Sequence, residues 1–154
     1  MKRRRTEEDG AAAVEFAIVG SLLFLILFGT IQFGLAYNRY QGLNAAAREG
    51  ARLGSLSATT KDEIITRVGQ SVSIVPPAAV AANPCPGTVT SGNGCTDVFI
   101  RQDNGSLVAA GSNPCNLNSG KTVVVQAKFG MQVPIPLWAN PLIVITGNGE
   151  FRCE

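Results

Sequence analysis

The feature that most constrains this chain lies near its N-terminus, where 23 consecutive residues from Phe16 to Asn38 carry no charge. A helix of that length reaches about 35 Å, and the hydrocarbon core of a bilayer is about 30 Å thick. A buried core helix is the alternative, but such a helix is usually shorter and has a polar face, which this run lacks. The sequence therefore predicts a transmembrane helix over residues 11–38, continued outside the membrane by a helical extension over residues 39–58.

The charges that flank this run predict its orientation. Residues Lys2 to Arg5 are all basic and precede it, whereas only Arg39 closely follows it. By the positive-inside rule, residues 1–10 form a cytoplasmic basic leader and residues 59–154 form an extracytoplasmic domain. A cleavable secretory signal is the alternative, and it predicts removal of residues 1–36 and a soluble product. Against it, the apolar run is too long and a good small-x-small cleavage site is missing.

Composition argues against catalysis and against nucleic-acid binding. Histidine is absent, which removes the commonest general base and the commonest metal ligand. The charged fraction is 16% and the net charge is +2, which does not indicate a nucleic-acid-binding surface. A calcium loop at Asp103 would need further carboxylates that the neighbouring sequence does not supply. We expect no enzyme activity, no cofactor and no metal site.

The external segment begins with the signature of a short helix. Thr60 and Glu63 have the spacing of a capping box, in which each residue satisfies a free backbone N–H at the helix N-terminus. Pro76 and Pro77 are expected to end the helix. Four apolar residues share one face of it, and we expect that face to pack in a core: Ile64, Ile65, Val68 and Val72.

The rest of the external segment predicts an antiparallel β-meander, so the fold class is α+β. Apolar residues alternate with others from residue 123 to residue 133, which predicts a strand with one buried face. A hairpin is expected from strands 97–102 and 106–109 around the turn residues Asp103-Asn104-Gly105. A Pro-rich turn carrying Trp138 then leads to the last strand, through Leu142–Thr146 and Glu150–Cys153. Trp138 either packs at the end of the sheet or serves as a contact residue.

The cysteines indicate that disulfides staple this domain. All four lie in the C-terminal half without a Cys-x-x-Cys pair, at Cys85, Cys95, Cys115 and Cys153. Disulfides in an oxidising compartment suit such a small domain, and free buried thiols in a reducing cytosol are the alternative. The sequence leaves three connectivities open. We favour Cys115–Cys153, because the parity of the last strand points Cys153 to the covered face, and Cys85–Cys95 within an irregular stretch from Pro76 to Thr96.

A stripe of small residues follows the apolar run. Ala46, Gly50 and Gly54 recur every four residues, so they share one face of the expected helical extension. Small residues at this spacing let another helix approach closely. We therefore treat them as candidate helix-packing residues, although such a stripe is common in Ala-rich helices.

The entry to the apolar run resembles the processing signal of type IV prepilins and pseudopilins. A basic leader ends in Gly10, and Ala11, Glu15 and Phe16 stand at the first, fifth and sixth places after it. The resemblance implies a cut between Gly10 and Ala11 by a prepilin peptidase on the cytoplasmic side. The new amine on Ala11 would lie one helical turn from Glu15, where the two charges could neutralise each other. Without that role, Glu15 is a carboxylate near the cytoplasmic membrane interface.

A longer block resembles the TadE-like proteins of the tight adherence pilus system. It comprises Ala13 to Phe16, Phe33 to Gly34 and Ala46 to Arg52, and the C-terminal strands resemble that family more weakly. The cysteines are not part of the family's pattern. The resemblance implies a single-pass protein of the bacterial inner membrane that takes part in pilus assembly as a minor pilin or pseudopilin-like component. Its implied partners are other pilin-like membrane proteins and a prepilin peptidase.

Two hypotheses of function follow. The first is a structural component of pilus assembly that acts through helix packing in the membrane. The alternative is a membrane-anchored extracytoplasmic binding module that is not incorporated in a pilus, with Trp138 or the loop between Cys85 and Cys95 as its contact surface. Cleavage after Gly10 discriminates between them.

Overall fold

The computed structural model describes residues 3–72, 85, 88–101, 104–116, 118–134 and 140–154, with side chains from residue 10 onward. Trp138, Asp103 and the Pro76-Pro77 pair lie outside the described residues. The expected α+β fold is confirmed: a long N-terminal helix and a short helix precede a three-stranded antiparallel sheet. The elements are α1 (Arg3–Gly54), α2 (Lys61–Ser71), β1 (Gly94–Ile100), β2 (Thr122–Gln132) and β3 (Leu142–Arg152).

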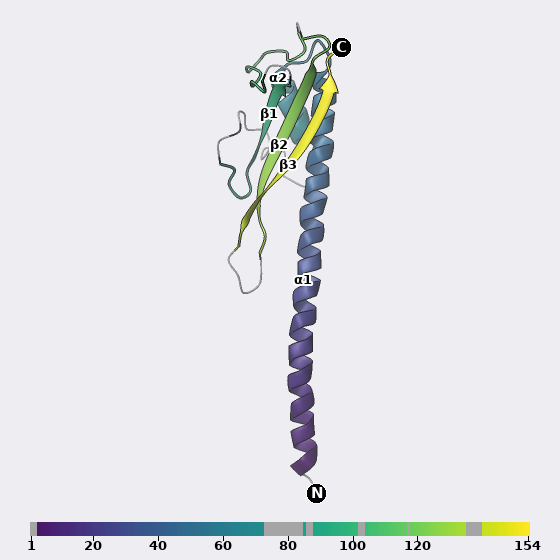
Figure 1. Cartoon of the computed structure of the whole chain (residues 1–154). Helices are drawn as coiled ribbons and strands as arrows, with labels where there is room; N and C mark the ends of the chain where they lie inside the picture. The colour runs from purple at the N-terminus through teal and green to yellow at the C-terminus, as the bar shows by residue number, and fades with distance from the viewer. Residues whose placement is uncertain (1–2, 73–84, 86–87, 102–103, 117, 135–139) are drawn as a thin grey trace.

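Helix α1 is the stem of the molecule. Its 52 residues reach about 78 Å, and α2 and the sheet gather on its C-terminal part while its N-terminal part projects alone (Figure 1). The leader, the apolar run and the extension form one continuous helix. The helix ends at Gly54 and not at residue 58, because the chain turns there into the segment that begins α2.

Helix α2 begins at the expected capping box. The Thr60 side chain accepts a hydrogen bond from the Glu63 backbone N–H, and the Glu63 carboxylate accepts one of 2.8 Å from the Thr60 backbone N–H. The expected apolar face is buried at Ile64, Ile65 and Val68. The helix ends at Ser71, before the two prolines.

Strand β2 lies at the centre of the sheet, whose order is β1-β2-β3. It pairs with β1 from Gly94↔Phe129 to Ile100↔Val123, and with β3 from Thr122↔Arg152 to Gln132↔Leu142. The expected alternation is confirmed, because one face of β2 is buried throughout. The buried residues on that face are Val123, Val125, Ala127, Phe129 and Met131.

The expected hairpin around Asn104-Gly105 is wrong in its extent. Both turn residues have positive φ, 55° and 70°, but among the described residues the returning arm pairs with β1 through the single bridge Phe99↔Leu107 and not through a longer ladder. Val108 then joins the arm to two elements. Its backbone N–H donates to the Val98 carbonyl of β1 over 2.8 Å, and its own carbonyl accepts a hydrogen bond of 2.5 Å from the Lys61 ammonium of α2.

Strand β1 also begins earlier than expected. It starts at Gly94, so Cys95 and Thr96 belong to the sheet and not to the irregular stretch before it. Both residues are fully buried in the strand.

The core lies between the sheet and the C-terminal third of α1 together with α2. Each of these elements contributes side chains that solvent does not reach, which joins them into one unit. The fully buried apolar residues are Leu43, Ala46, Ala47, Ala51, Ile64, Val68, Val98, Val123, Val125 and Ala127.

Two disulfides fix the ends of this unit. Cys85 is bonded to Cys95 and Cys115 to Cys153, which is the favoured connectivity. The first ties the segment before β1 to that strand. The second ties the loop before β2 to the end of β3, and Cys153 is buried as its parity predicted.

Candidate functional site

The N-terminal part of α1 exposes a continuous apolar surface. Phe16 is 78% exposed and Phe33 is 73% exposed, and of the large apolar side chains between them all but the half-buried Phe28 are also exposed. This is the one helix in the described part of the chain that is long and apolar enough to cross a membrane. A soluble protein rarely leaves so much apolar surface bare, so a bilayer or other helices must cover it.

Aromatic side chains mark the C-terminal end of this apolar surface. The rings of Phe33 and Tyr37 stack with their centroids 6.3 Å apart, and Tyr37 and Tyr40 are separated by the same distance. Amphipathic aromatic rings are enriched where membrane-spanning segments leave the hydrocarbon. We call Phe33, Tyr37 and Tyr40 the aromatic band.

The candidate processing residues lie near the opposite end of the surface. Gly10, Ala11, Glu15 and Phe16 are exposed and belong to continuous helix, and nothing lies within 4 Å of the position a Cβ on Gly10 would take. Ala11 and Glu15 are four residues apart, so they occupy the same face one turn from each other. Cleavage after Gly10 would require the helix to unwind locally at this point.

The small-residue stripe packs inside the domain. A Cβ added to Gly50 would lie 2.4 Å from Cγ2 of Val68, and one added to Gly54 would lie 2.8 Å from Cδ1 of Ile64. Ala46 is fully buried. The helix that approaches this stripe is therefore α2 of the same chain, and the stripe is not available to a neighbouring chain.

Two glycines that the sequence analysis missed allow β3 to lie directly on α1. A Cβ on Gly147 would lie 2.5 Å from the carbonyl carbon of Leu43, and one on Gly149 would lie 2.1 Å from the carbonyl oxygen of Ala47. Both glycines are on the inner face of β3, so backbone packs on backbone. Glycines two residues apart within a strand were the available signal.

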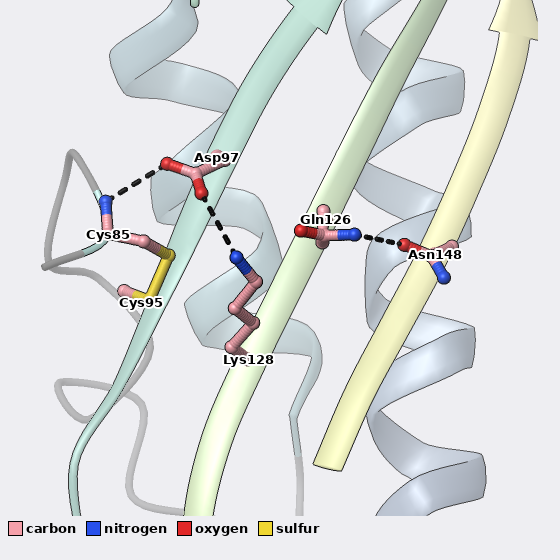
Figure 2. A network of polar contacts seen from close by, with 6 residues as sticks. All are labelled: Cys85, Cys95, Asp97, Gln126, Lys128 and Asn148. Carbon is pink, nitrogen blue, oxygen red and sulfur yellow. Dashed lines mark hydrogen bonds and ion pairs between the residues drawn. A yellow bond between two sulfur atoms is a disulfide. The ribbon is translucent and has the colours of Figure 1, made fainter. Parts of the chain in front are cut away.

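The outer face of the sheet carries a polar network that anchors the first disulfide (Figure 2). The Asp97 carboxylate accepts a hydrogen bond of 2.9 Å from the Cys85 backbone N–H, and its other oxygen lies 3.7 Å from the Lys128 ammonium. Alongside, the Gln126 side-chain amide donates to Asn148 over 3.0 Å. Asp97 therefore holds the disulfide-linked segment against β1. The described residues contain no cluster of His, Cys, Asp and Glu that could hold a metal ion.

An ion pair joins α2 to α1. Arg67 donates a hydrogen bond of 2.9 Å to the Glu49 carboxylate, and this bond lowers the pKa of Glu49 below its ordinary value. The pKa of Glu63 is lowered as well, mainly because its carboxylate accepts a hydrogen bond from the Thr60 backbone N–H, and also because it accepts one from the Thr60 hydroxyl. Both contacts are structural, since they serve the packing and capping of helices.

These features define a class of protein: a chain with one N-terminal helix able to span a membrane and a small disulfide-bonded α+β domain packed on the end of that helix. A family model described as TadE-like protein matches residues 10–52, which confirms the resemblance drawn from the sequence over that segment. The matched segment includes the exposed apolar surface and most of the part of α1 that the domain covers. No curated protein and no solved structure matches the chain.

Proposed function

We propose that this chain is a structural component of Tad-type pilus assembly, a minor pilin or pseudopilin-like protein whose N-terminal helix packs against neighbouring helices in the membrane. The TadE-like match supports a role in that assembly system. The observation that carries the proposal is the division of α1. Most of its large apolar side chains are exposed as far as Tyr40, and from Leu43 onward one face of the helix is buried in its own domain. One half is thus free to pack between chains while the other half carries a rigid domain.

The proposed arrangement places residues 1–10 in the cytoplasm and the sheet outside. The basic leader supports this orientation, and two disulfides suit an oxidising compartment. The surface for lateral association is the exposed run of α1, because the small-residue stripe is occupied by α2. A catalytic role is not part of the proposal, since the sequence lacks histidine.

Processing after Gly10 would prepare the helix for packing. The ammonium group created on Ala11 would lie one turn from the Glu15 carboxylate, or could reach the Glu15 of a neighbouring chain. An ammonium group that neutralises the Glu15 carboxylate lowers the free-energy cost of burying that carboxylate among packed helices. The pair would also set the axial register between chains.

The alternative is a membrane-anchored extracytoplasmic binding module that keeps its leader. The intact mass of the protein extracted from membranes of its native host discriminates between the two. We expect a chain that begins at Ala11 and that gains four hydrogens on reduction, two for each disulfide. A chain that retains residues 1–10 would favour the anchored module.

Glu15→Ala then tests the packing role. We expect this variant to reach the membrane but to be depleted from sheared pili, because its helix has lost the charge that pairs with the new amine. Glu15→Asp is the matched control, since it keeps a carboxylate at the same position. Equal recovery of both variants in the pilus fraction would contradict the proposed role of Glu15.

A further inference from the structure

The N-terminal end of β3 is apolar on both of its faces. Leu142 is 47%, Ile143 43% and Val144 45% exposed. Side chains of neighbouring residues in a strand point to opposite faces of the sheet, so this end of β3 exposes apolar side chains on both faces. The other end of the same strand carries Glu150 and Arg152. Strand β3 therefore has one apolar and one charged end.

The apolar end points along α1 toward its exposed half. The contacts of Gly147 with Leu43 and of Gly149 with Ala47 show that β3 and α1 run in the same direction. In Figure 1 the lower ends of β2 and β3 point in the direction of the exposed half of α1 and diverge from the helix. The charged end of β3 accordingly lies at the top of the domain, far from the exposed apolar half of α1.

The level that the apolar end reaches on α1 follows from the rise of each element. Leu142 precedes Gly147 by five residues, which in a strand is about 16 Å. On a helix that distance corresponds to about eleven residues. Counted back from Leu43, this places Leu142 near the level of Phe33, where the aromatic band begins.

That segment is where α1 leaves the hydrocarbon. If the bilayer core begins at Phe16, its thickness of about 30 Å is spanned by about twenty residues, so the outer interface falls at the aromatic band. The sequence from Phe129 to Gly149 contains no charged residue that this position would bring into the membrane. The apolar end of β3 and the aromatic band thus reach the same plane from two separate segments of the chain.

We propose that the apolar end of β3 inserts into the outer lipid interface and forms a second membrane contact beside α1. The occupant is lipid and not another protein chain. Lipid acyl chains can contact both apolar faces of this strand at once, whereas a docked protein would cover one of them. This contact fixes the tilt of the sheet relative to the membrane before any assembly. It rests on α1 spanning the bilayer and does not depend on the pilus role.

Depth-dependent fluorescence quenching tests the proposal. Trp138 is the sole tryptophan, so Trp138→Phe combined with Ile143→Trp leaves one tryptophan, inside the proposed contact, as the reporter in the full chain. We would reconstitute this protein in phosphatidylcholine vesicles brominated at an upper or a terminal position of the acyl chain. The upper bromines should quench the reporter most strongly. An unquenched reporter would overturn the proposal, whatever the further variants show.

Matched double variants show which residues make the contact. Leu142→Asp with Val144→Asp should reduce quenching by the upper bromines at least twofold, whereas Leu107→Asp with Phe151→Asp should not change it. Leu107 and Phe151 are equally exposed apolar residues away from the proposed contact. Native disulfides and circular dichroism establish that each variant is folded. Emission that instead depends on the protein-to-lipid ratio would assign the surface to a second copy and overturn the lipid contact.

Discussion

The contact between β3 and α1 makes Gly149→Ala the most informative substitution in the domain. A Cβ at this position would lie 2.1 Å from the carbonyl oxygen of Ala47, 2.3 Å from its carbonyl carbon and 2.5 Å from the backbone nitrogen of Arg48. All three are backbone atoms of a helix, so no side-chain rotation can relieve the overlap. The strand must move away from α1, and the core between them must open.

The cost follows from these contacts. Overpacking a core costs about 1–3 kcal/mol, and backbone atoms that cannot rotate away place this case at the upper end, about 3 kcal/mol. Replacing glycine also restricts the unfolded chain, which offsets about 0.4–1 kcal/mol. We therefore expect Gly149→Ala to lower the free energy of unfolding by about 2 kcal/mol or more.

Urea unfolding of the full chain in detergent, followed by near-UV circular dichroism, measures this loss. Gly34→Ala is the matched control, because nothing lies within 4 Å of the Cβ it would add. If Gly149→Ala and Gly34→Ala unfold at the same urea concentration, the backbone of β3 does not lie on α1 and the reasoning is refuted.

Three further predictions concern the same domain. Replacing Cys115 and Cys153 together by Ser should lower the free energy of unfolding by about 3–4 kcal/mol, because their disulfide closes a loop with a sequence separation of 38. Thr60→Ala should cost about 1 kcal/mol through loss of the α2 cap. Because Arg67 lowers the pKa of Glu49, their bond stabilises the native state above the ordinary glutamate pKa, and this stability is lost as the pH falls through the lowered value.

Each of these has a control. Reducing agent should lower the free energy of unfolding of the wild-type chain by at least as much, since it breaks both disulfides, and any further loss that it causes in the double Cys→Ser variant comes from Cys85–Cys95. A wild-type chain of unchanged stability on reduction would contradict this prediction. Thr66→Ala, on the exposed face of α2, should cost less than Thr60→Ala; a larger cost there would contradict the capping role. Urea midpoints measured between about pH 6 and pH 3 should depend less on pH in Glu49→Gln than in the wild type, and identical profiles would rule out the bond.

Local patterns predicted much of the fold because the forces behind them are local. The capping box at Thr60 and Glu63 is a contact between near neighbours in sequence, and the apolar run and the period of two in β2 follow from which side chains of one helix or strand face water. The parity that pointed Cys153 to the covered face belongs to the same kind of evidence. Such patterns depend little on how distant segments meet.

Choices between distant partners could not be predicted in this way. The stripe at Gly50 and Gly54 predicted that something would approach closely, but small size does not specify whether the neighbour is α2 or another chain. The sequence around Gly147 and Gly149 is compatible with a strand, but it does not show that the strand approaches α1. The arm after Gly105 has the turn chemistry of a hairpin, but the local sequence does not show that its Val108 is shared between Val98 of β1 and the distant Lys61 of α2.

The most direct test of the proposed role is to count surface pili on the native host after deletion of this chain. Complementation with the wild-type chain and with a chain truncated before Thr60, which keeps α1 but lacks the domain, separates the contributions of helix and domain. We expect few or no pili in the deletion strain and recovery only with the full chain. A normal number of pili in the deletion strain would contradict the proposal and leave the anchored binding module in its place.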